Sequence, residues 1–208
     1  GILSAQRLER SFHRLERLRE RIARAAAGRH AGGGAGEPER EQFGAEVAAA
    51  AVTLVRNETR MIPLRDGPLR VITLAPGGDT GPTLGRALSR RRPDVVEVRL
   101  DPRDGRIEGD AGGLTIIVTH SRGTPDPPAV ELVRAAHRRA GDRLVVVASG
   151  TPYDLAAFPE VRCYLATYGR EPVMLEAAAR VLTGEIAPRG RLPVSIPRCH
   201  PAGWGVVW

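Results

Sequence analysis

A glycine-rich segment, Gly77 to Gly81 (GGDTG), follows a predicted strand and has the residue types of a phosphate-binding loop. It lacks the G-x-G-x-x-G spacing of dinucleotide sites, and the chain has no lysine for a Walker motif. The tight turn that glycine permits explains the segment more simply. Asp79 within it remains a candidate for contact with a substrate or with another domain.

His120, Ser121 and Asp154 are the residue types of a serine-hydrolase triad. However, Ser121 has no surrounding G-x-S-x-G motif, and Ser149 is directly followed by a glycine and is not flanked by glycines in the required way. We therefore do not predict a triad. His120 ends a predicted strand, where it either forms a substrate or interdomain hydrogen bond or merely closes a loop.

The sequence shows no His, Cys, Asp and Glu residues at metal-ligand spacing, so we expect no metal and no other cofactor. A carboxylate pair of the kind that cleaves glycosides is not identifiable either. The cysteines, Cys163 and Cys199, lack the spacing of a metal or redox motif, and Cys163 is expected to be a small buried apolar residue.

The chain has 208 residues and a formal net charge of +7, and all 31 of its basic residues are arginine. These arginines are spread along the sequence, and only 4% of the residues are aromatic and able to stack on bases. We therefore predict no nucleic-acid partner. No apolar run approaches the roughly 20 residues that span a bilayer, which predicts no membrane partner. The compartment, cytoplasmic or secreted, is left open.

The chain is organised around residues 143–154, RLVVVASGTPYD. Five consecutive apolar residues, 144–148, are typical of a strand buried on both faces. Such a strand needs a covering layer on each side, which places it at the centre of an open parallel sheet. Ligand contacts in these sheets gather beyond the carboxyl ends of the strands.

The flanking segments alternate between strand and helix patterns, which predicts an α/β fold. It is a doubly wound, mostly parallel sheet of five to six strands with helices on both faces, preceded by an N-terminal linker helix. The predicted strands are residues 69–75, 95–100, 114–119, 144–148, 161–167 and, at an edge, 192–196. The predicted helices are residues 4–27, 38–57, 80–91, 127–141 (with Asp126 as N-cap) and 171–182.

The first predicted helix carries apolar residues at three- and four-residue steps between Arg and Glu residues. This stripe consists of Leu8, Phe12, Leu15, Leu18 and Ile22. A glycine-rich loop, 28–39, follows the helix. We predict two parts, residues 1–40 with the linker helix and loop, and residues 41–208 with the α/β domain.

Several segments together resemble the C-terminal domain of glycoside hydrolase family 3. Residues 48–57 (AAAAVTLVRN) are similar to its entry helix, 61–64 (MIPL) to its L-L-P-L, and 145–154 (VVVASGTPYD) to its central strand and Pro-Tyr-Asp turn. Residues 166–169 (ATYG) resemble its A-Y-G segment. Residues 181–197 (VLTGEIAPRGRLPVSIP) resemble its V-L-x-G-x-x-x-P-x-G-x-L-P-V segment.

The resemblance implies a partner domain, a TIM barrel that carries the family's aspartate nucleophile and is missing from this sequence. The β-glucosidase branch places its acid/base glutamate in long insertions of the C-terminal domain, and this chain has short loops there. That favours the β-N-acetylglucosaminidase branch, whose acid/base histidine belongs to a barrel loop. No catalytic residue is therefore assigned to this chain.

The resemblance also suggests contacts with a carbohydrate substrate or with the barrel. The candidate residues at the strand ends are Asp79, His120, Ser121, Arg122, Tyr153 and Asp154. If the family's strand order holds, strands 69–75 and 144–148 are neighbours, and their loops flank the switch point. Asp154 has a simpler role as well, because aspartate is a good N-cap for the turn at 155–158.

The leading hypothesis is an accessory domain of a family 3 glycosidase acting on β-linked N-acetylhexosamine, inactive alone. A rival is a stand-alone carbohydrate-binding or interaction module that has lost its barrel. A nucleotide-binding domain is disfavoured because the fingerprints are absent. Without a barrel, the stripe on helix 4–27 predicts packing on the α/β domain or on a second copy, as a homodimer.

Overall fold

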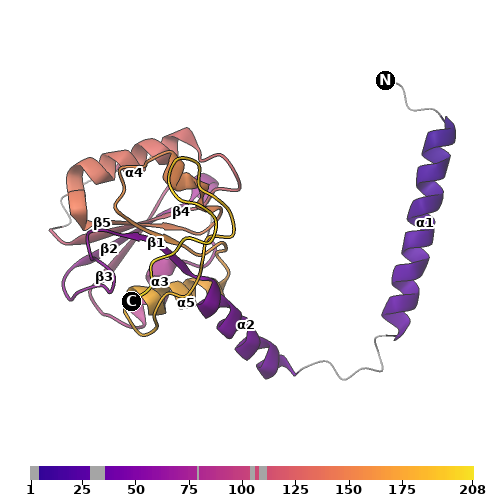
Figure 1. Cartoon of the computed structure of the whole chain (residues 1–208), viewed down its shortest axis with the longest axis horizontal. Coiled ribbons are helices and arrows are strands. Elements are labelled where there is room, and N and C mark those ends of the chain that lie inside the picture. Colours follow the sequence, from indigo (N-terminus) through magenta and orange to yellow (C-terminus); the bar gives the residue numbers. More distant parts are fainter. Residues whose placement is uncertain (1–4, 29–35, 79, 104–105, 108–111) are drawn as a thin grey trace. The chain divides into compact units, whose positions relative to one another are not determined.

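The computed structural model of the chain describes residues 5–28, 36–78, 80–103, 106–107 and 112–208. The chain divides into two compact units, unit 1 (Gly1–Arg40) and unit 2 (Glu41–Trp208). Figure 1 shows the elements of both.

Unit 1 contains α1 (Ala5–Gly28), which confirms the helix predicted at the start of the chain. Its apolar stripe faces solvent, and the side chain of Leu8 lies outside the described part. The exposed members of the stripe, between 49% and 60% accessible, are Phe12, Leu15, Leu18 and Ile22. Arginine and glutamate side chains flank this stripe, so α1 is strongly amphipathic.

Unit 2 is built on one six-stranded sheet in the order β1-β6-β5-β4-β2-β3. Its strands are β1 (Thr53–Asn57), β2 (Leu69–Leu74), β3 (Val95–Leu100), β4 (Leu114–Thr119), β5 (Leu144–Ala148) and β6 (Cys163–Ala166). All neighbouring strands are parallel except β1, which runs antiparallel to β6. The predicted mostly parallel, doubly wound sheet is confirmed.

Helices cover both faces of this sheet (Figure 1). The α-helices are α2 (Glu37–Ala51), α3 (Leu84–Ser89), α4 (Pro127–Ala140) and α5 (Pro172–Leu182), and the 3₁₀ turns are η2 (Pro76–Gly78), η3 (Gly141–Arg143) and η4 (Pro152–Ala156). α4 packs on one face, and α3 and α5 pack on the other. In the part of the chain that the structure describes, no helix combines the length and apolar character needed to cross a membrane.

β5 shows why the sheet needs two covering layers. All five of its residues are buried, and they alternate between the two cores. Val145 and Val147 belong to the core under α3 and α5, whereas Val146 and Ala148 belong to the core under α4. β4 and β6 flank it, so this strand lies inside the sheet as predicted.

Two predicted edge elements were wrong. Residues 53–57 form strand β1 and do not continue the preceding helix; Leu54 and Val55 are fully buried in the two cores. Residues 192–196 are not a strand of the sheet, because their backbone groups form hydrogen bonds within the C-terminal segment. Leu192 N donates to Trp204 O at 2.8 Å, and Ile196 N donates to His200 O at 2.8 Å. The sheet edge beside β6 is occupied by β1.

Two helix starts depend on proline and its neighbours. α3 begins at Leu84, later than predicted, and Thr83 caps it by accepting a hydrogen bond from Arg86 N at 3.3 Å. α4 begins at Pro127 after Asp126, as predicted. Within the described residues, however, the Asp126 carboxylate forms no capping hydrogen bond.

The doubly covered sheet makes a direct prediction for core substitutions. Leu165→Ala in β6 removes a fully buried side chain and should lower the free energy of unfolding by about 2–5 kcal/mol. The control Val96→Ala, in edge strand β3 and 60% exposed, should cost less than about 1 kcal/mol. Chemical denaturation followed by circular dichroism measures both. Equal losses would contradict this packing.

Candidate functional site

The candidate site lies at the carboxyl edge of the sheet, where the strand order reverses. After β2 the chain passes to β3 on one side and then to β4 on the other, and both strands pair with β2 in parallel. The switch point therefore lies between β2 and β4, the position where open α/β sheets bind ligands.

The expectation that β2 and β5 are neighbours was wrong, because β4 lies between them. Strand order depends on which edges pair in space, and chain order does not encode this. Consequently the loop after β4, with His120, Ser121 and Arg122, flanks the switch point. The Asp154 turn lies one strand further out.

Asp154 is almost fully enclosed at this edge, with 1% of its surface exposed. Its Oδ2 accepts a hydrogen bond from Thr119 Oγ1 at 2.7 Å, and its Oδ1 accepts one from Ser121 Oγ. Asp154 lies inside η4, whose N-cap residue is Thr151, so the predicted capping role was wrong. Its carboxylate instead ties η4 to the end of β4.

Backbone contacts reinforce this link between the two loops. Ser149 N and Oγ both donate to Thr119 O at 2.8 Å, and Thr151 N donates to Ser121 O at 2.9 Å. A Cβ atom on Gly150 would lie 2.0 Å from Ser121 O. The close approach of the loops therefore requires glycine at this position.

Burial raises the pKa of the Asp154 carboxyl above its ordinary value of 3.8. The hydrogen bonds from Ser121 and Thr119 and the nearby His120 act in the opposite direction but are weaker. The hydrogen bonds of the Asp154 carboxyl hold the two loops together. Because this carboxyl is almost fully buried, it is too enclosed to contact a ligand directly.

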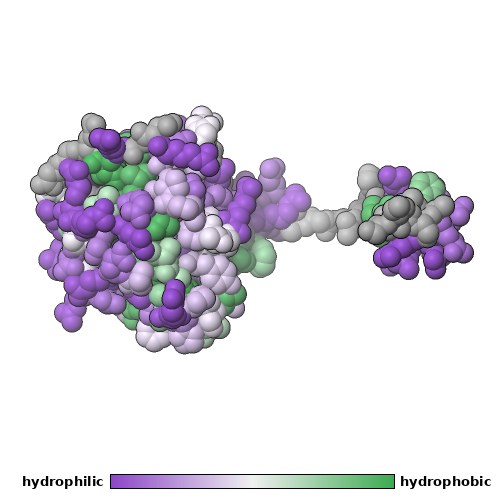
Figure 2. All heavy atoms as spheres, turned by 90° about the horizontal axis from the view of Figure 1, so that it is seen from above, coloured by the Kyte–Doolittle hydropathy of each residue, from purple (hydrophilic) through white to green (hydrophobic). Residues whose placement is uncertain are grey.

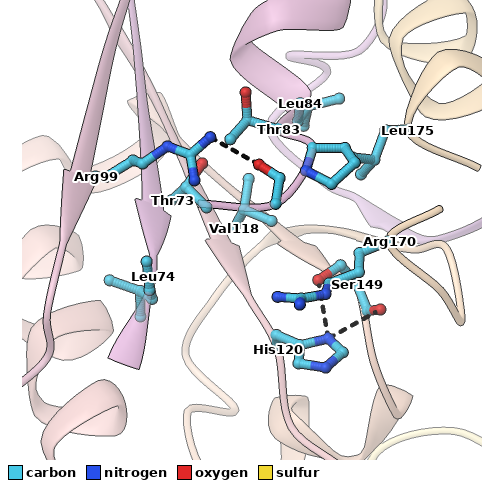
Figure 3. A pocket seen from close by; sticks show the side chains of 13 residues that line it. Thr73, Leu74, Thr83, Leu84, Arg99, Val118, His120, Ser149, Arg170 and Leu175 are labelled. Carbon is cyan, nitrogen blue, oxygen red and sulfur yellow. Dashed lines mark hydrogen bonds between the residues drawn. The ribbon is translucent and has the colours of Figure 1, made fainter. Parts of the chain in front are cut away.

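His120 lies between two small cavities. Its Nδ1 is 3.3 Å from both Ser149 Oγ and Ser149 O (Figure 3). One cavity, of about 20 Å³, is lined by His120 together with Thr73, Arg99 and Arg170. The other, of about 30 Å³, is lined by His120 with Ser121 and Asp154. Each is large enough for about one water molecule.

The other predicted site residues are spread along the edge. Arg122 is exposed on the His120 loop, and half-buried Tyr153 lines an open groove of about 900 Å³ beside α4. Asp79 lies outside the described residues. Thr119 and Ser149 were not predicted as site residues, although each lies at or just after the end of a predicted buried strand, where polar side chains converge.

The chemistry of this edge is hydrogen bonding and positioning. Among the described residues, no three His, Cys, Asp or Glu side chains are close enough to hold a metal ion. The hydroxyls of Thr119 and Ser121 and the carboxylate of Asp154 satisfy one another by hydrogen bonding.

Residues 115–201 match the family model described as the glycosyl hydrolase family 3 C-terminal domain. The α/β unit has the fold of this domain. The family resemblance seen in the sequence is thus supported over the region that contains β4, β5, β6 and the site. No curated protein sequence matches the chain.

Solved structures agree with this fold. The domain is similar to a fungal multi-domain family 3 β-N-acetylglucosaminidase (28% identity, TM-score 0.66), covering 76% of this chain and 19% of that one. It is also similar to the family 3 β-N-acetylglucosaminidase of Paenibacillus sp. str. FPU-7 (24% identity, TM-score 0.64), covering 90% and 39%. A β-glucosidase from Listeria innocua is 12% identical with a TM-score of 0.59, covering 74% and 27%. The chain thus spans well under half of each relative.

The buried Asp154 carboxyl, which ties η4 to the end of β4, should make the free energy of unfolding depend on pH. Because the folded-state pKa of this carboxyl is raised, its contribution to stability is greatest when it is protonated and falls as pH rises through the window above 3.8. Asp154→Asn removes this ionisation. The free energy of unfolding of the native chain minus that of Asp154→Asn should therefore decrease as pH rises through that window, measured by urea denaturation.

Asp154→Ala provides the structural comparison for that series. It deprives the buried Ser121 and Thr119 hydroxyls of their acceptor and should cost about 1–3 kcal/mol for each group left unpaired. A difference between the native chain and Asp154→Asn that rises with pH would contradict a raised pKa.

Proposed function

We propose that this domain is the C-terminal accessory domain of a family 3 glycosidase that hydrolyses β-linked N-acetylhexosaminides. Its role is to support a catalytic TIM barrel and to line one side of the sugar site. The observation that carries the proposal is the short, self-bonded rim at the carboxyl edge. There the loop after β4 and the loop after β5 are tied together by Asp154 and Gly150.

This rim favours the N-acetylhexosaminidase branch over the β-glucosidase branch. The resemblance to the family places the β-glucosidase acid/base glutamate in long insertions of this domain. Here residues 120–126 connect β4 directly to α4, and residues 149–151 connect β5 to η4. The two relatives named as β-N-acetylglucosaminidases, at 28% and 24% identity, give further support.

The residues that we propose for substrate or barrel contact are His120, Arg122 and Tyr153, with Asp79 as a further candidate. Ser121 and Asp154 act as positioning residues, since each has at most 9% of its surface exposed. They hold the loop that carries His120 and Arg122 against η4, which carries Tyr153.

We further propose that α1 belongs to the segment that connects this domain to the barrel. The match to the Paenibacillus enzyme covers 90% of this chain, whereas unit 2, 168 of 208 residues, makes up 81%. The match therefore extends beyond unit 2. Figure 2 shows apolar and hydrophilic side chains together on α1, and a barrel surface would bury the apolar ones.

Activity measurements test this function. The 208-residue chain alone should not hydrolyse chromogenic β-N-acetylglucosaminides or β-glucosides, because the family nucleophile belongs to the barrel. The same domain in a protein that contains the barrel should turn over the N-acetylglucosaminide preferentially. Turnover by the repurified chain alone, or a preference of the barrel-containing protein for β-glucosides, would contradict the proposal.

A stand-alone carbohydrate-binding module is the alternative, and the open groove lined by Tyr153 is the feature that favours it. It predicts that the isolated chain binds neutral oligosaccharides. Titration calorimetry with N-acetylglucosamine oligomers, with Tyr153→Ala as the matched variant, separates the two functions.

In the absence of a barrel, the α1 stripe should bind a second copy of the chain. Arginine and glutamate side chains flank this stripe. We propose a homodimer through α1.

Sedimentation equilibrium checks this association. The chain should show a concentration-dependent dimer that Leu15→Glu abolishes, because a charge in the stripe cannot be buried without a partner. Arg17→Gln, outside the stripe, is the control and should leave the dimer intact. A monomer whose α1 amides exchange freely with solvent would contradict it.

A further inference from the structure

The segment that follows α5 returns to the sheet and bonds to its edge strand β1. Val206 N donates to Leu54 O at 2.7 Å, and Trp204 Nε1 donates to Val55 O at 2.9 Å. We call residues 192–206 the C-terminal strap. It satisfies backbone carbonyls of an edge strand, which would otherwise be free to pair with another chain.

The C-terminal strap also completes the hydrophobic cores of the α/β unit. Leu192 and Ile196 are buried in the core under α4. Val206 packs against the core under α3 and α5. A change that detaches the strap would therefore alter one defined part of the unit, the edge at β1.

His200, in the middle of the strap, is bonded to an arginine of β1. Arg56 Nε donates to His200 Nε2 at 3.0 Å. A guanidinium has N–H donors and no acceptor, so this contact requires His200 Nε2 to be unprotonated. Arg56 is itself fixed, because its Nη1 donates to Pro159 O at 2.6 Å and to Val161 O at 2.9 Å. Only 13% of the Arg56 side chain is accessible.

The charges around this contact favour a neutral imidazole. Burial, and after it the positive charge of Arg56, lower the pKa of His200 below its ordinary value of 6.5. Glu58, just after β1, acts in the opposite direction and is the weaker effect. The charge of Glu58 is shared, since its carboxylate lies 3.9 Å from Arg56 and 3.3 Å from Arg162. Arg162 in turn pairs with Asp142 at 2.8 Å.

The other face of the contact is aromatic. The imidazole of His200 stacks on the indole of Trp204, with ring centroids 4.9 Å apart and planes at 17°. An indole face attracts a cation, which opposes the effect of Arg56. Trp204 is 42% exposed, however, so solvent weakens this attraction, whereas Arg56 touches the imidazole directly in a largely buried position. The contact with Arg56 therefore decides the charge of His200.

We propose that the C-terminal strap is a pH-sensitive latch on β1, closed by neutral His200 and released when this imidazole is protonated. Protonation places an N–H group opposite the Nε N–H of Arg56, so the hydrogen bond is lost and two cations face each other. Release would free Trp204 and Val206 from the carbonyls of β1. The inference is independent of the proposed glycosidase function, since it concerns the conformation of this chain alone.

The direction of the pH dependence follows from the lowered pKa of His200 in the folded state. The contribution of neutral His200 to holding the strap is complete above 6.5, the ordinary value. It is lost as pH falls through the window below that value. Asp154 acts with the opposite sign, because its raised pKa makes the rest of the unit more stable as pH falls. Loss of the strap at low pH is thus distinguishable from general acid unfolding.

Amide hydrogen exchange of the 208-residue chain tests the latch between about pH 8 and about pH 5, the range in which histidine titrates. Each rate is divided by the intrinsic rate at the same pH. The amides of Leu192 and Val206 should lose protection as pH falls, while the amides of β5, which report on the whole unit, keep theirs. In NMR spectra the His200 imidazole should titrate below 6.5, in step with this loss.

The variant His200→Gln separates the latch from other pH effects. Its side-chain amide oxygen can accept from Arg56 at every pH, so the protection of the strap should no longer depend on pH. His13→Gln, an exposed histidine on α1, is the matched control and should respond to pH like the native chain. Circular dichroism at neutral pH verifies folding, and if His200→Gln unfolds, the imidazole titration of the native chain decides.

Three results would overturn the latch. The first is equal protection of the strap amides at both ends of the pH range. The second is a simultaneous loss of protection in the strap and in β5. The third is a folded His200→Gln variant whose strap loses protection at low pH as the native strap does.

Discussion

The structure depends on a sheet whose inner strands are buried on both faces. All residues of β5 and β6 are buried, and β4 has one half-buried residue, so their backbone groups must be paired along the ladder. Each large apolar side chain buried there contributes about 1.5–3 kcal/mol, which is why helices must lie on both faces. Polar side chains are excluded from the layers, and the places left for them are the strand ends. This makes the carboxyl edge the natural place for function.

At that edge the chain satisfies its buried polar groups internally. Asp154 accepts from Thr119 and Ser121, and Ser149 bonds back to Thr119 O. A buried carboxylate without such donors would be costly. Two loops separated by about thirty residues thereby become one rim. The same arrangement leaves His120 between two small cavities.

Several surface arginines form ion pairs that link neighbouring segments of the α/β unit. Arg91, just after α3, bridges Glu176 and Glu185, which links this segment to α5 and the residues after it, and these contacts raise the pKa of Arg91. Arg92 pairs with Asp94 and also donates to the carbonyls of Arg65 and Gly67. These contacts occupy several arginines on the surface of the α/β unit.

The sequence by itself determined the layers of this protein. The apolar run at 144–148, Pro127 after Asp126 and the stripe on α1 are local patterns, so the fold class and most helices could be predicted. The tertiary structure alone decided strand order, the identity of residues 53–57 as a strand, and the inward turn of Asp154. Each of these depends on contacts between distant segments: β1 pairs with β6, β4 inserts between β2 and β5, and Asp154 bonds residues 33 and 35 positions earlier. Such contacts are chosen by packing and edge pairing in space, and no local pattern records them.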